Sequence, residues 1–87
     1  MKIEQAINDA TYFLKKNNIE SSKLDSEILM SFVINKTRKF IILNSQMEID
    51  QNCLITFKKL INERSCGKPI AYLTGKKDFW NNEFKID

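Results

Sequence analysis

The sequence predicts an all-α fold, a small bundle of four to five helices that is followed by a short C-terminal β-hairpin. Apolar residues recur at helical spacing through most of the chain up to Arg64. The two glycines and the only proline are confined to positions 67–75, and strand-like segments occur only after them. We therefore expect a helical domain over residues 1–75 and a hairpin linker over residues 76–87.

The first helix is expected over residues 2–16. Its apolar stripe comprises Ile3, Ala6, Ile7, Ala10, Phe13 and Leu14. These positions lie on one face of a helix with 3.6 residues per turn. Asn17 and Asn18 follow, and asparagine tolerates the left-handed conformation that ends many helices.

The second helix is expected to begin at Ser22, where Ser22 to Asp25 resembles a capping box. Its predicted buried face comprises Leu24, Ile28, Leu29, Phe32 and Val33, with Met30 and Ile34 to the side. Asn35 and Lys36 are expected to end this helix.

A short third helix is predicted over residues 38–43, with Thr37 as its N-cap. The apolar run 40–43 could also be a buried strand, but no β partner is nearby, so we favour helix. The fourth helix follows Asp50 as N-cap. Its apolar stripe comprises Cys53, Leu54, Phe57, Leu60 and Ile61.

The residues after the fourth helix predict a change of direction. Gly67 suits the position that ends a helix, and Pro69 suits the first turn of a new one over residues 69–74, which Gly75 closes. Beyond it, two strand-like segments flank Asn81 and Asn82, a pair that suits a tight hairpin turn.

The composition limits the chemistry that these 87 residues can perform. Histidine is absent, and Cys53 and Cys66 lack the spacing of a zinc site, so we predict no metal site. The two cysteines form no disulfide framework, and no stretch resembles a membrane span or a signal peptide. We therefore expect a cytoplasmic protein without a membrane partner.

The charge pattern does not favour nucleic-acid binding. The net charge is +3, lysine supplies 12 of the 14 basic residues, and acidic residues are interspersed among them. A helical nucleic-acid-binding module stays open as an alternative, and it predicts an affinity that falls steeply with salt. A second alternative is a scaffold domain that stabilises a neighbouring domain and contacts no partner.

One stretch near the C-terminal end resembles a family signature. It reads Gly67-Lys68-Pro69-Ile70-Ala71-Tyr72-Leu73-Thr74-Gly75, with Arg64 before it and Lys77-Asp78-Phe79-Trp80 after it. This is similar to a pattern in the N-terminal domain of the HemK family, the release-factor glutamine N5-methyltransferases. Upstream, the segment from Leu24 to Met30 resembles the family's D-A-E-L-L-L helix, with Ser26 in place of alanine.

The resemblance implies a helical recognition domain that a β-hairpin joins to a Rossmann-like methyltransferase domain. The full enzyme would methylate, from S-adenosylmethionine, the glutamine of the G-G-Q motif in class 1 peptide chain release factors. The family's glycine-rich cofactor loop and N-P-P-Y motif do not occur in these 87 residues. The resemblance therefore assigns no catalytic or cofactor-binding residue here, and we expect the chain to act with a methyltransferase domain in cis.

Eight residues around the signature have predicted roles. The candidate partner contacts are Arg64, Lys68, Tyr72, Lys77 and Trp80. The alternative is that the cations are solvated charges and that the aromatic residues close the small core. The predicted structural junction comprises Gly67, Pro69 and Gly75.

Overall fold

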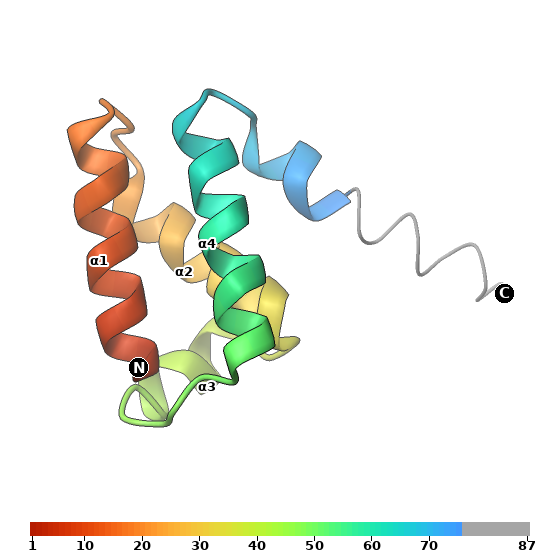
Figure 1. Ribbon diagram of the computed structural model, residues 1–87. Coiled ribbons are helices and arrows are strands. Elements are labelled where there is room, and N and C mark those ends of the chain that lie inside the picture. The colour runs from red at the N-terminus through yellow and green to blue at the C-terminus, as the bar shows by residue number, and fades with distance from the viewer. Residues whose placement is uncertain (76–87) are drawn as a thin grey trace, which may run out of the picture.

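The computed structural model describes residues 1–75, and within them it confirms an all-α fold. Four helices have the bounds α1 (Ile3–Lys16), α2 (Ser22–Ile34), α3 (Arg38–Leu43) and α4 (Gln51–Ser65). Residues 70–75 form a fifth helical segment, which turns back beside α4 on the side away from α1 (Figure 1). The predicted hairpin over residues 76–87 lies outside the described residues.

Asparagines end α1 and α2, as predicted. Asn18 and Asn35 have φ angles of 66° and 59°, in the left-handed region that asparagine tolerates better than most residues. After Asn18 the chain folds back, and the amide of Ile19 donates to the carbonyl of Leu14 at 3.0 Å. The free carbonyl groups at the helix end thereby gain partners.

Side-chain caps begin α3 and α4, as the sequence predicts. Thr37 Oγ1 accepts a hydrogen bond from the amide of Phe40 at 3.1 Å. The Asp50 carboxylate accepts hydrogen bonds from the amides of Asn52 and Cys53 at 3.1 and 3.3 Å. Such caps satisfy amide groups that have no partner inside the helix. The apolar run in α3 is therefore helical, and the prediction of helix over strand is confirmed.

The predicted cap of α2 is wrong. The residue at the N-cap is Ser21, and its side chain makes no hydrogen bond to the amides of the helix. Ser21 Oγ instead donates to Asp25 Oδ2 at 2.8 Å, and the same oxygen accepts from Arg64 of α4. The Asp25 carboxylate therefore contacts the N-cap hydroxyl and Arg64, and does not form the predicted capping box.

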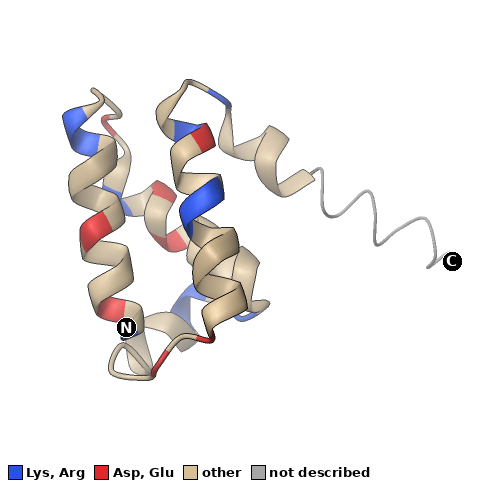
Figure 2. Cartoon of the chain, in the orientation of Figure 1, with Lys and Arg blue, Asp and Glu red and all other residues tan. Residues whose placement is uncertain are grey.

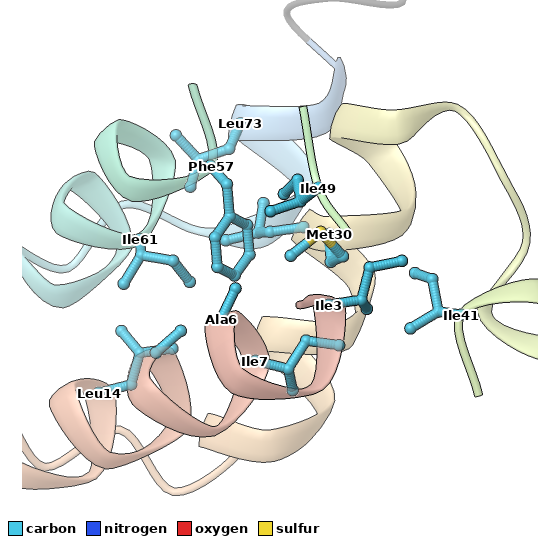
Figure 3. Close-up of a cluster of buried hydrophobic side chains, with 12 residues drawn as sticks. Ile3, Ala6, Ile7, Leu14, Met30, Ile41, Ile49, Phe57, Ile61 and Leu73 are labelled. Carbon is cyan, nitrogen blue, oxygen red and sulfur yellow. The ribbon is translucent and has the colours of Figure 1, made fainter. Parts of the chain in front are cut away.

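One hydrophobic core connects the helices (Figure 3). Its buried residues are Ile3, Ala6, Ile7, Ala10, Leu14, Leu29, Met30, Ile41, Ile49, Phe57, Ile61 and Leu73. Figure 3 shows the ring of Phe57 pointing from α4 toward Ala6 of α1, with Leu73 beside it. Leu73 therefore anchors segment 70–75 to the bundle through burial of its apolar surface.

The buried face of α2 differs from the predicted face. Leu24, predicted to be buried, is 44% exposed, whereas Met30, predicted to lie at the side, is 0% exposed. The buried residues of α2 are Ser22, Asp25, Ser26, Leu29 and Met30. Their spacing is helical, but the first turn is polar, so a search for apolar residues alone does not find this stripe.

Phe13 is also more exposed than its place in the first apolar stripe predicts. It borders a groove of about 260 Å³ between α1 and α4, whose lining includes Ala6, Ala10 and Leu54. The alanine side chains are short, so they leave space between the two helices. Phe13 therefore lies at the edge of the core rather than inside it.

Candidate partner-contact surface at the end of helix α4

The chain turns sharply after α4, and Gly67 makes this turn possible. Its φ angle is 104°, which residues with a side chain rarely adopt. The Gly67 amide donates to the carbonyl of Arg64 at 2.9 Å, and the Lys68 amide donates to the carbonyl of Glu63 at 3.3 Å. This pair of bonds is a Schellman motif. Gly67 thus ends α4 and sends the chain back along the bundle.

Pro69 begins the segment that follows this turn. A proline is well placed at a helix start, where its missing amide hydrogen is not needed. The amides of Tyr72 and Leu73 donate to the Pro69 carbonyl at 3.1 and 3.2 Å. Gly75, predicted to close this helix, is itself helical and is the last described residue.

Arg64 is held by groups of its own chain. Its Nε donates to Asp25 Oδ2 at 2.9 Å, and its Nη1 donates to the Lys68 carbonyl at 3.2 Å. The side chains of Arg64 and Asp25 are only 19% and 6% exposed. Breaking a charge pair this shielded from water leaves an uncompensated buried charge. The internal hydrogen bonds of Arg64 leave little of its side chain accessible to a partner. A direct contact between Arg64 and a partner stays a prediction.

Lys68 and Tyr72 lie together on the outside of the turn. Lys68 Nζ is 3.2 Å from Glu63 Oε1 and 5.9 Å from the centre of the Tyr72 ring. Tyr72 is 51% exposed, and Lys68 is also exposed. An ammonium group is attracted to the face of an aromatic ring at such a distance. We call this pair the Lys68–Tyr72 surface, which offers a partner both a cation and an aromatic ring.

The structure thus brings together three of the five predicted contact residues, because Arg64 donates a hydrogen bond to the backbone of Lys68. Lys77 and Trp80 lie outside the described residues. The sequence reasoning missed Asp25 as the partner of Arg64. One signal could have suggested the pair, since both residues lie in segments that carry the family resemblance.

Other kinds of site are not evident in the described residues. Among residues 1–75, no three or more acidic or cysteine side chains are grouped closely enough to hold a metal ion. None of the helices there is long and apolar enough to cross a membrane. Figure 2 shows that α1 carries acidic residues in its first part and basic residues at its end, and that α4 carries both kinds. This mixed pattern differs from the basic stripe that is typical of nucleic-acid-binding helices.

Known proteins resemble this chain along most of its length. Residues 5–75 match the family described as the PrmC N-terminal domain. A release factor glutamine methyltransferase from Clostridium acetobutylicum is 39% identical over 87 residues, which is 100% of this chain and 30% of that protein. A bifunctional methyltransferase from Rickettsia conorii is 35% identical over 85 residues, which is 98% of this chain and 16% of that protein.

A third relative is also a longer methyltransferase that matches this chain over only part of its own length. The release factor glutamine methyltransferase from Yersinia pestis is 42% identical over 62 residues, which is 71% of this chain and 22% of that protein. The chain therefore spans at most 30% of the length of these three relatives. No solved structure shows a significant match to it.

Proposed function

Because this chain belongs to the PrmC N-terminal domain family, we propose that it recognises the substrate of a protein methyltransferase. The substrate would be a class 1 peptide chain release factor, methylated on the glutamine of its G-G-Q motif. The names of the relatives from Clostridium acetobutylicum and Yersinia pestis support this proposal, since both are release factor glutamine methyltransferases.

The observation that carries the proposal is the extent of the family match. It covers residues 5–75, so it includes nearly the whole helical bundle and the turn that presents Lys68 and Tyr72. Aromatic residues are enriched in protein interfaces, where a large rigid ring adds contact area at a low entropic cost. The Lys68–Tyr72 surface is therefore our candidate for the contact with the release factor.

The contribution of such a domain is positional. Methyl transfer requires the glutamine amide to lie close to the methyl donor and in line with it, and this orientation lowers the entropic part of the barrier. A domain that binds the release factor at a site separate from the catalytic site restricts the directions from which the glutamine can approach. We propose that residues 1–75 supply this separate binding site and that residues 76–87 link them to a methyltransferase domain.

The groove between α1 and α4 does not fit S-adenosylmethionine. Its volume is about 260 Å³, and apolar side chains such as Phe13 and Leu54 form much of its lining. A nucleoside and a charged amino acid group need several polar partners in fixed positions. We therefore place the cofactor in the proposed methyltransferase domain, where it would supply the methyl group.

A binding titration of the 87-residue chain against a purified class 1 release factor tests the proposal. We expect saturable binding at both low and moderate salt, and no preference for tRNA. Replacing Tyr72 by alanine should weaken the affinity about tenfold, a loss typical of a central aromatic contact.

Tyr12 offers a matched control. It is 66% exposed on α1, and Lys16 Nζ lies 5.4 Å from its ring centre, so its surroundings resemble those of Tyr72. We expect Tyr12→Ala to bind the release factor like the unmodified chain. Equal losses for the two variants would contradict the Lys68–Tyr72 surface as the contact. A complete absence of binding would favour the scaffold alternative, and a preference for tRNA would favour a nucleic-acid-binding module.

A further inference from the structure

Arg64 connects three parts of the chain that are distant from one another in sequence. It lies in the last turn of α4, and its Nε donates to Asp25 in the first turn of α2, 39 positions earlier. Its Nη1 donates to the carbonyl of Lys68, beyond the turn at Gly67. A guanidinium is planar and carries donors in a fixed fork, so it can hold two acceptors in a defined relative position.

The segment that follows Lys68 packs on the bundle through apolar side chains. Residues 70–75 form less than two helical turns, and a helix this short is not stable without tertiary contacts. Its buried anchor is Leu73, which is 3% exposed, and Ile70 packs partly against the same core. Apolar contacts of this kind are not directional. They hold the segment on the bundle but do not by themselves set its angle.

We infer that Arg64 is a positioning residue that, together with the turn at Gly67, sets the direction in which the chain leaves the helical bundle. The Asp25 carboxylate fixes the guanidinium, and the guanidinium fixes the Lys68 carbonyl. The orientation of Pro69, and hence of segment 70–75, follows from that carbonyl. Arg64 thereby determines how the Lys68–Tyr72 surface is presented, and this consequence for binding rests on the proposed function.

A simpler role for Arg64 would be to brace α2 against α4. The two roles differ in what the substitution Arg64→Lys removes. A lysine ammonium can still pair with Asp25, but it lacks the planar fork that reaches Asp25 and the Lys68 carbonyl together. If Arg64 positions the segment, the variant should keep its global stability and lose the order of the segment. If Arg64 only braces α2 against α4, the substitution should lower the stability of all helices to the same extent.

Amide hydrogen exchange of the 87-residue chain, followed by NMR, distinguishes these roles. In Arg64→Lys we expect exchange at the amides of Tyr72 and Leu73 to accelerate about tenfold, as expected for the loss of one hydrogen bond to a charged group. Amides in the centres of α1 and α4 should keep their exchange rates. Unchanged rates at Tyr72 and Leu73, or a uniform acceleration that includes α1 and α4, would overturn the inference.

The second arginine of the chain provides the control. Arg38 also pairs with a carboxylate, Glu27, at 2.8 Å, but its side chain is exposed and its pair lies away from the turn. Arg38→Lys should change neither the exchange at Tyr72 and Leu73 nor the affinity for a release factor. In the same titration, Arg64→Lys should bind a release factor about tenfold more weakly, because the Lys68–Tyr72 surface is no longer held in place.

Hydrogen exchange and the binding titration test the role of Arg64 and the proposed function independently of each other. If the unmodified chain does not bind a release factor, the proposed function fails, while hydrogen exchange still decides whether Arg64 orients segment 70–75. If the unmodified chain binds and Arg64→Lys loses segment order without losing affinity, the positioning role in binding is wrong.

Discussion

At the scale of single residues, the helix ends show why the two glycines are not equivalent. Asn18, Asn35 and Gly67 all have positive φ angles, but the angle at Gly67 is 104°, beyond the left-handed region near 60° that asparagine occupies in the other two. A side chain is strained at this angle, whatever space surrounds it. Gly75 is helical, and no such constraint applies to it.

Substituting each glycine by alanine tests this difference. A Cβ atom would meet no atom within 4 Å at either position, so crowding does not enter the comparison. Gly67→Ala should lower the free energy of unfolding by ~1–2 kcal/mol, because it forces alanine into a backbone conformation with positive φ. Thermal unfolding followed by circular dichroism should show a Tm lower by several degrees.

Gly75→Ala is the matched control, and it should not destabilise the protein. Alanine is a better helix former than glycine by ~1 kcal/mol in a helix interior, so the Tm should stay the same or rise slightly. A Gly67→Ala variant as stable as the unmodified chain would show that the turn after α4 relaxes without cost.

At the scale of helices, capping residues set where the elements begin. Asp50 lies before α4 and accepts hydrogen bonds from two amides of its first turn. Its negative charge is also placed at the positive end of the helix dipole. The cap therefore stabilises the helix that carries Phe57, Ile61 and Arg64.

Replacing Asp50 by alanine should lower the free energy of unfolding by ~1 kcal/mol, since both amides lose their partner. Urea unfolding monitored by circular dichroism measures this change through the midpoint of the transition. Asp50→Asn is the control, because asparagine caps a helix about as well as aspartate and should leave the midpoint nearly unchanged. Equal losses in both variants would point to the charge at the helix end, and not to the hydrogen bonds.

The helices also differ in how much of their structure the sequence could predict. The positions of the helices were predictable, because periodic apolar residues and caps such as Thr37 and Asp50 are local signals. The buried face of α2 was not, because its first turn buries Asp25, whose partner Arg64 is 39 positions away. A long-range ion pair leaves no periodic pattern in either helix.

The contact roles in the candidate site stay predictions, but the structure shows how three of its residues lie. Lys68 and Tyr72 were expected as partner contacts, which stays a prediction, and the structure places both at exposed positions close to each other. Arg64 was expected as a contact on the same grounds, but its hydrogen bonds to Asp25 and Lys68 hold it against the bundle. A sequence motif identifies residues that belong to one site, but it does not distinguish those that face a partner from those that hold the others in place.

At the scale of the whole molecule, the small size of the core makes stability the first condition for any function. A chain of 87 residues buries a smaller fraction of its surface than a larger domain does. Its core depends on a few large side chains, and Phe57 is the largest fully buried one among residues 1–75. Phe57 and Leu73 belong to the same cluster, so the turn that presents Tyr72 also depends on this core.

Phe57→Ala should therefore unfold a large fraction of the molecules at room temperature. Removing a buried phenylalanine side chain costs ~3–5 kcal/mol, which approaches the whole stability of a small domain. The control is Ile55→Ala on the same helix, whose side chain is exposed, so its effect should stay within ~0.5 kcal/mol. Urea unfolding of the three chains gives the comparison. If Phe57→Ala loses less than ~1 kcal/mol, the core must be able to collapse into the space that the ring leaves, as the neighbouring groove between α1 and α4 would allow.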